Sequence, residues 1–177
     1  GRVSPKGESL ACGVVLLLAE VAHMHCEREP IHARNLADAA VAIARLLPEG
    51  AYPVDSIRAL RGLAWKERAN ALRFLAEYDA ALEAVDQAAA EFQHFGSHAF
   101  ELANLAYIRA VILTYTDRLD EATQHASQSA AIFTEYGDIN RAMQARSVQA
   151  AVLYYNREYS AAVSIFKQLR AFAALKY

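Results

Sequence analysis

Hydrophobic residues recur three or four positions apart along most of the chain, which is the spacing of one face of an α-helix. Before residue 54 this pattern covers residues 9–27 and 32–47, and Pro48, Gly50 and Pro53 then interrupt it. Proline cannot donate a backbone hydrogen bond, so such a cluster ends a helix. The pattern therefore predicts one helix pair within residues 1–53.

From residue 54 onward a longer helical pattern occurs three times, and matching positions recur every 40 or 41 residues. The first helices of the three units align without gaps at 65–72, 106–113 and 146–153, and the second helices align at 78–85, 119–126 and 159–166. Internal repetition at such a period is typical of stacked helical units. We expect three helix pairs in residues 54–177, at about 55–96, 97–137 and 138–177.

Small residues occupy fixed columns of this alignment, where two helices must approach closely. The columns are Ala69, Ala110 and Ala150 in the first helices, and Ala81, Ala122 and Ala162 in the second helices. Leu72, Leu113 and Leu153 provide the bulky contact between the paired helices. Gly96–Ser97 and Gly137–Asp138 lie between units, and each pair of residues suits a left-handed helix end followed by an N-cap.

This arrangement resembles the tetratricopeptide repeat family, whose signature places a tryptophan, a small and a large residue in the first helix and Ala-x3-aromatic in the second. The matching residues are Trp65, Ala69, Leu72, Ala81, Val85 and Phe166. Arg68 departs from the leucine column, alanine replaces glycine, and no proline ends a unit. The repeats are similar to the longer ones of bacterial regulators, which often end as Phe133–Asp138 does here.

The resemblance covers residues 58–177 and implies an all-α, right-handed α-solenoid of antiparallel helix hairpins with about eight helices. Residues 1–53 would form a degenerate N-terminal hairpin of the same continuous domain. In this family the first helix of each pair lines a concave groove. The resemblance therefore implies a binding groove that contains Lys66, Asn70, Arg73, Asn104, Tyr107, Thr114, Gln144 and Tyr154.

Lys66 and Asn70 match the two leading positions of the family's carboxylate clamp, whereas Ile108 and Val148 stand where the clamp expects Asn and Arg. A complete clamp is therefore not expected. The groove would be basic at one end and rich in tyrosine at the other, and Tyr and Arg are residue types that anchor interfaces. The alternative is that Tyr115, Tyr154 and Tyr155 pack helix ends together.

Composition agrees with helices and excludes several functions. About a fifth of the residues are alanine, a strong helix former, and there are only 7 glycines. The formal net charge is -2, which argues against direct binding to nucleic acid or to a membrane surface, since both require a local excess of Lys and Arg.

The apolar run at residues 10–19 is too short to span a membrane. Two cysteines, Cys12 and Cys26, are too few for a disulfide framework and favour a cytoplasmic location.

Catalysis and cofactors are not expected. Serines lie inside helical patterns without a strand-turn-helix elbow, and paired carboxylates occur at turns or helix ends. The residues His23, His25, Cys26 and His32 are of metal-binding types, but their spacing fits no standard zinc site. We expect this cluster to be a partly buried structural patch.

Two hypotheses for the function remain. The first is a non-catalytic scaffold whose groove binds a protein or peptide partner. The alternative is a regulatory fragment of a larger bacterial signalling or transcription-regulatory protein, in which the repeats sense a ligand or peptide. The chain begins with Gly1 and stops at Tyr177 inside an amphipathic pattern, so we interpret it as part of a longer protein.

The last helix carries apolar residues that a solenoid end would expose, unless another segment or another copy covers them. These residues are Ile165, Phe166, Leu169, Phe172, Ala173 and Leu175. The sequence therefore predicts a homodimer through the C-terminal helix.

Overall fold

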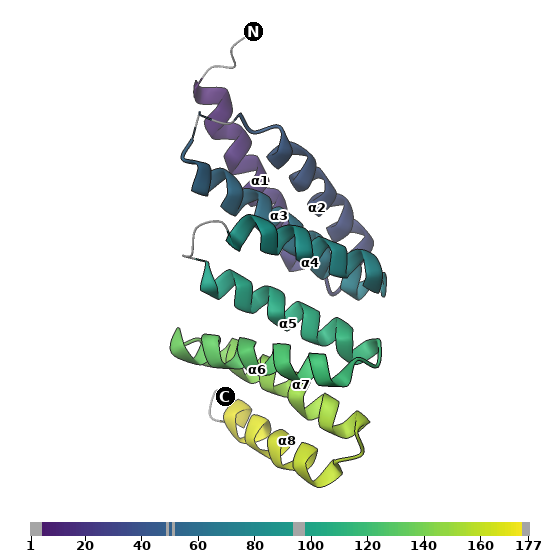
Figure 1. Cartoon of the computed structure of the whole chain (residues 1–177). Coiled ribbons are helices and arrows are strands. Elements are labelled where there is room, and N and C mark those ends of the chain that lie inside the picture. Colours follow the sequence, from purple (N-terminus) through teal and green to yellow (C-terminus); the bar gives the residue numbers. More distant parts are fainter. Residues whose placement is uncertain (1–4, 49, 51, 94–97, 175–177) are drawn as a thin grey trace. The chain divides into compact units, whose positions relative to one another are not determined.

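The computed structural model describes residues 5–48, 50, 52–93 and 98–174, and this part of the chain is all-α. It contains eight helices that pack in consecutive antiparallel pairs (Figure 1). The helices are α1 (Pro5–His25), α2 (Pro30–Arg45), α3 (Val54–Phe74), α4 (Tyr78–Phe92), α5 (Ala99–Tyr115), α6 (Leu119–Glu135), α7 (Ile139–Tyr155) and α8 (Tyr159–Ala174). The predicted all-α arrangement of helix pairs is confirmed.

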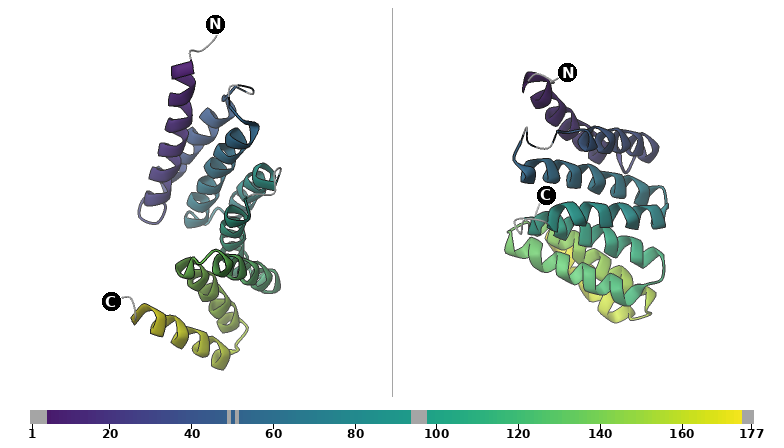
Figure 2. Two further views of the ribbon diagram at one scale, coloured as in Figure 1. Left: turned by 90° about the vertical axis from the view of Figure 1, so that its left-hand side faces the viewer. Right: turned by 45° about the horizontal axis from the view of Figure 1, so that its top comes forward.

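The chain divides into two compact units, Gly1–His98 and Ala99–Tyr177. The first unit holds α1 to α4 and the second holds α5 to α8. Within each unit, successive helices run in opposite directions (Figure 2). The first helices of neighbouring pairs also touch, α1 with α3 and α5 with α7. That the whole chain forms one continuous solenoid stays a prediction.

The core of the first unit lies between α1, α2 and α3. Val15, Val41 and Leu60 are buried in one cluster, which Trp65 partly covers. A second buried cluster lies near the C-terminal end of α1, and small side chains let the helices approach closely there. Its members are Ala22, Cys26, Ala33, Ala37 and Ala71.

The pair α3 and α4 is held by one especially close contact. Phe92 is fully buried, and its ring lies against Gly62 of α3. A Cβ atom placed on Gly62 would lie 2.7 Å from Phe92 Cε1 and Cζ. Glycine is therefore required at this point of α3 because the phenyl ring occupies the space of a side chain.

Part of the core of the second unit forms three layers, and each layer takes one buried residue from α5, one from α6 and one from α7. The layers are Ala103–Phe133–Ala142, Ala110–Ala126–Val148 and Leu113–Ala122–Val152. Two of the layer alanines, Ala110 and Ala122, belong to the predicted small columns. All six column residues are at most 2% exposed: Ala69, Ala110, Ala150, Ala81, Ala122 and Ala162. Leu72 and Leu113 are buried as predicted, whereas Leu153 is only half-buried.

The turn inside three of the pairs has the same backbone conformation. Ala76, Asp117 and Arg157 have φ values of 57°, 61° and 65°, and they occupy equivalent positions of the repeat. In each turn the next amide donates to the carbonyl five residues earlier, at 3.0 Å from Glu77 to Leu72, 2.9 Å from Arg118 to Leu113 and 2.8 Å from Glu158 to Leu153. This is the hydrogen bond of a Schellman helix end, formed here without glycine.

The junction between α6 and α7 follows the sequence prediction. Gly137 has a φ of 73°, and the carboxylate of Asp138 accepts a hydrogen bond from the Arg141 amide at 3.0 Å. A left-handed helix end and an N-cap are therefore both present. The corresponding prediction for Gly96–Ser97 lies outside the described residues.

Candidate functional site

The predicted binding residues of the first unit lie on one face of α3. Lys66, Asn70 and Arg73 are spaced four and three residues apart, which places them on the same side of a helix. This side faces α1, because Glu67 and Asn70 hydrogen-bond to His23 and Cys26 of that region. The structure thus brings the three residues together, but within a polar network between two helices.

Glu67 is the centre of one half of this network. Its side chain is only 7% exposed, and its two oxygens lie 2.9 Å from His23 Nδ1 and 3.4 Å from Lys66 Nζ. Because an unpaired buried carboxylate is costly, both partners stabilise it. The positive charge of Lys66 is therefore partly neutralised inside the protein.

Asn70 is the centre of the other half. Its Nδ2 donates to Cys26 Sγ at 3.2 Å, and its Oδ1 accepts from Arg73 Nη2 at 2.7 Å. The Arg73 guanidinium also lies 4.1 Å from the centre of the Phe74 ring. Buried Asn70 therefore positions Arg73 and is not itself open to a ligand.

The chemistry of Cys26 is altered by the same network. Burial raises the pKa of the Cys26 thiol, and the negative charge of Glu67 raises it further. The neutral thiol is thereby favoured over the thiolate, which is the form that reacts as a nucleophile or binds metal.

The predicted histidine and cysteine patch is divided between separate partners. His23 faces Glu67, whereas the rings of His25 and His32 contact each other edge to face with centroids 5.4 Å apart. Within the part of the chain that the structure describes, no group of three His, Cys, Asp or Glu side chains has a metal-binding arrangement.

In the second unit, Asn104, Tyr107 and Thr114 share one face of α5. Asn104 Nδ2 donates to the Phe100 carbonyl at 3.2 Å, and Thr114 Oγ1 donates to the Ala110 carbonyl at 2.8 Å. Tyr107 is half-buried against two of the core layers. This face is therefore partly exposed and made of residues that are held in place by their own helix.

The adjoining helix α7 presents Gln144 and Tyr154 ten residues apart on one side, and both are exposed. Tyr154 belongs to an aromatic cluster at the α7–α8 turn, with its ring centroid 5.9 Å from that of Tyr155 and 5.6 Å from that of Tyr159. The three tyrosines are 58%, 53% and 54% exposed. We call Tyr154, Tyr155 and Tyr159 the tyrosine cluster.

Tyr159 is not among the predicted binding residues. Those residues come from the first helix of each pair, and Tyr159 lies in a second helix, α8. Helix-surface spacing cannot reveal a contact that crosses a turn. The only sign of the tyrosine cluster in the sequence is that tyrosines are frequent between residues 154 and 159.

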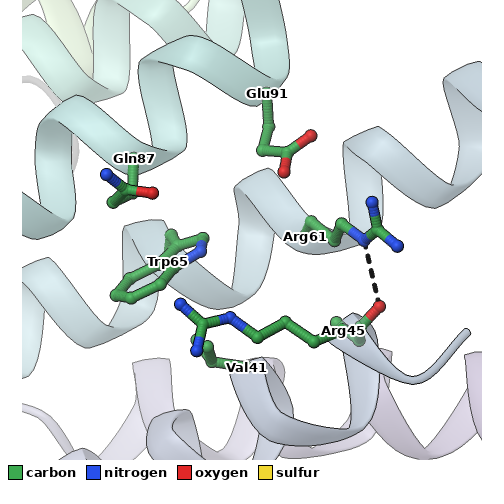
Figure 3. Close-up of a pocket in the computed structure, with 7 residues that line it drawn as sticks. Val41, Arg45, Arg61, Trp65, Gln87 and Glu91 are labelled. Carbon is green, nitrogen blue, oxygen red and sulfur yellow. Dashed lines mark hydrogen bonds between the residues drawn. The ribbon is translucent and has the colours of Figure 1, made fainter.

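The first unit also contains a cleft that the repeat pattern of the sequence does not predict. It lies between α2, α3 and α4, has a volume of about 250 Å³, and is lined by Val41, Ala44, Arg45, Arg61, Trp65, Gln87 and Glu91 (Figure 3). Trp65 matches a packing column of the repeat, yet its ring also borders this cleft.

No described helix has the length and apolar character needed to cross a membrane. Comparisons with known proteins add no assignment: no family model, no curated protein and no solved structure matches the chain.

Proposed function

We propose that the chain is a tetratricopeptide-like repeat module that acts as a non-catalytic protein-interaction scaffold. It binds a peptide or a helix of a partner protein along the first-helix face of its repeats. The repeated helix pairs, the identical turns and the buried alanine columns support the repeat assignment. The helix-in-groove mode of recognition suits a surface made of parallel helix faces.

The tyrosine cluster is the observation that carries the proposal. Three tyrosines that are each more than half exposed lie together at one end of α7, and Gln144 extends the same helix face toward the other end. Large aromatic residues are enriched among the residues that dominate binding energy, because they bury much area and keep a polar group for hydrogen bonding. The cluster would anchor the partner, and Asn104 and Thr114 on α5 would flank it.

The network on α3 would contribute charge in the first unit. Arg73 is half-exposed and held by Asn70, so its guanidinium is positioned in advance for an acidic group of the partner. Lys66 would contribute less, because Glu67 already lies 3.4 Å from its ammonium group.

The raised pKa of Cys26 supports a non-catalytic role. Cys26 lies in the same network as a histidine and a carboxylate, a combination that could otherwise activate a thiol. The nearby Glu67 disfavours the thiolate, so the most reactive residue type in the network is kept neutral.

A peptide-display library selected on the full chain tests this proposal. Affinity of the selected peptide is then measured for wild type, Tyr154→Ala, Arg73→Ala and Tyr107→Ala. The control is Tyr136→Ala, whose tyrosine is 56% exposed and lies outside the proposed face. We expect Tyr154→Ala to weaken binding about tenfold or more and Arg73→Ala to weaken it less. Unchanged affinity in Tyr154→Ala, Arg73→Ala and Tyr107→Ala would refute the proposed surface.

A further inference from the structure

The cleft between α2, α3 and α4 combines an apolar floor with hydrogen-bond donors. Val41 and Ala44 of α2 are 6% and 1% exposed and form the floor. Arg45 of α2 and Trp65 of α3 border the cleft, and Gln87 of α4 lies above Trp65 (Figure 3). A small polar group with an aliphatic stem would fit both parts of this cleft.

The Arg45 guanidinium is positioned by an aromatic ring. Its central carbon lies 5.1 Å from the centroid of Trp65, and no carboxylate among the described residues forms an ion pair with it. A stacked guanidinium keeps its planar N–H groups available for a second, in-plane partner. Arg45 can therefore bind an anion without losing its contact with Trp65.

The described lining of the cleft contains two further charged residues, Arg61 and Glu91. Arg61 donates from Nε to the Ala44 carbonyl at 3.1 Å, which fixes the base of its guanidinium beside the floor (Figure 3). Glu91 is the only acidic residue among the described residues of the lining, and its Oε2 lies 3.5 Å from Nη1 of Arg58, which is not one of the described lining residues. The Glu91 carboxylate thus already has a cationic partner outside the cleft.

Two more polar side chains border this space. The indole Nε1–H of Trp65 has no acceptor in the described part of the chain, and the side-chain amide of Gln87 lies above the Trp65 ring (Figure 3). A carboxylate offers two oxygens with about four acceptor positions, and it matches the planar geometry of a guanidinium. A neutral or cationic ligand would leave the Arg45 guanidinium without an ion-pair partner among the described residues.

We propose that this cleft binds the carboxylate of an acidic side chain, Asp or Glu, from a protein segment. The carboxylate pairs with Arg45 and hydrogen-bonds to Trp65 and Gln87, and the aliphatic stem packs on Val41 and Ala44. The site involves the second helices α2 and α4, so it is separate from the first-helix face proposed above. Its test does not depend on that face.

The chain contains a single tryptophan, so Trp65 fluorescence and its one indole N–H resonance report on this cleft alone. The probes are the peptide acetyl-Gly-Gly-Glu-Gly-Gly-amide, the neutral analogue with Gln in place of Glu, and free glutarate. Each is titrated into the full chain. The Glu peptide should give a saturable change in both Trp65 signals, and the Gln peptide should give none.

Arg45→Gln should weaken binding of the Glu peptide about tenfold or more, since hydrogen bonds to charged groups are among the strong ones. Arg45→Lys should fall between wild type and Arg45→Gln, because it keeps the charge and loses the planar fork. The control Arg28→Gln removes another exposed arginine of the same unit, outside the cleft, and should bind as wild type does. Thermal unfolding followed by circular dichroism verifies that each variant is folded.

Equal or tighter binding of glutarate would support the carboxylate site and would assign a free small carboxylate as its source. The proposal is overturned if neither the Glu peptide nor glutarate changes the Trp65 signals, or if folded Arg45→Gln binds as wild type does.

Discussion

At the scale of single residues, contacts between side chains far apart in the sequence determine what the predicted binding residues do. Asn70 was expected on an open groove, because its register places it on the first-helix face. Its hydrogen bond to Cys26, 44 residues away, makes it a buried residue that positions Arg73. Periodicity gives the side of a helix on which a residue lies, but it does not give the partner that meets that side.

Trp65 also has contacts that its position in the repeat does not predict. The alignment identifies it as a family column, and it does pack against the buried cluster of the first unit. Its contact with Arg45, whose guanidinium carbon lies 5.1 Å from the ring centroid, comes from α2, a helix that no repeat position links to it. Arg68, at 5.3 Å from the ring centroid, is a neighbour on α3 itself. The cleft could not be predicted because three helices contribute to it.

Gly62→Ala should destabilise the first unit. The added Cβ would lie 2.7 Å from the buried Phe92 ring, and overpacking of a filled core costs about 1–3 kcal/mol. Against this, alanine is favoured over glycine inside a helix by about 1 kcal/mol. We expect a net loss of up to about 2 kcal/mol in the free energy of unfolding, measured by urea denaturation with Trp65 fluorescence.

Gly13→Ala provides the matched control. Gly13 also lies inside a helix of this unit, but a Cβ atom there would have no neighbour within 4 Å. Only the helix preference remains, so this variant should be slightly more stable than wild type. Equal changes in the two variants would show that the contact with Phe92 does not limit residue 62.

At the scale of elements, the sequence predicts the helices well because their apolar spacing is regular over whole turns. Helix α2 begins at Pro30, a residue suited to the first helical position, two residues before the predicted start. The turns are less predictable. Ala76, Asp117 and Arg157 adopt positive φ although none is glycine, and the tertiary packing of each pair imposes that conformation.

The positive φ values of these turns lead to opposite expectations for a substitution that removes a glycine and one that introduces a glycine. Gly137→Ala places a Cβ at a φ of 73° where no neighbouring atom would clash, so the backbone penalty of about 1–2 kcal/mol applies. The lower flexibility of alanine in the unfolded chain offsets about 0.4–1 kcal/mol of this penalty. Ala76→Gly, at a φ of 57°, changes both contributions in the opposite direction. Gly137→Ala should therefore be destabilised, and Ala76→Gly should be neutral or slightly stabilised.

Urea denaturation followed by circular dichroism measures both variants against wild type. A loss of stability in Ala76→Gly as large as that in Gly137→Ala would contradict the backbone explanation. It would then indicate that the Ala76 side chain contributes a contact of its own.

At the scale of the whole molecule, α8 differs from the other second helices in how little of it is covered. Ala162 is the one buried residue among the described positions of α8, while Val163 and Phe166 are 48% and 45% exposed. By contrast, α4 buries four small or branched residues and Phe92. Of the predicted apolar set, Leu175 lies outside the described residues.

An apolar helix side of this kind favours association, because burying it against a second copy removes it from water. We therefore expect the chain to form a homodimer through α8, with an apparent mass that rises with concentration in multi-angle light scattering. Phe166→Glu should shift the equilibrium to monomer, since a buried unpaired carboxylate is costly. Ser164→Glu adds the same charge to an exposed position two residues away, on the opposite side of the helix, and should leave the dimer intact. A wild-type chain that stays monomeric at the highest attainable concentration, or equal dissociation in both variants, would show that α8 is not the dimer interface.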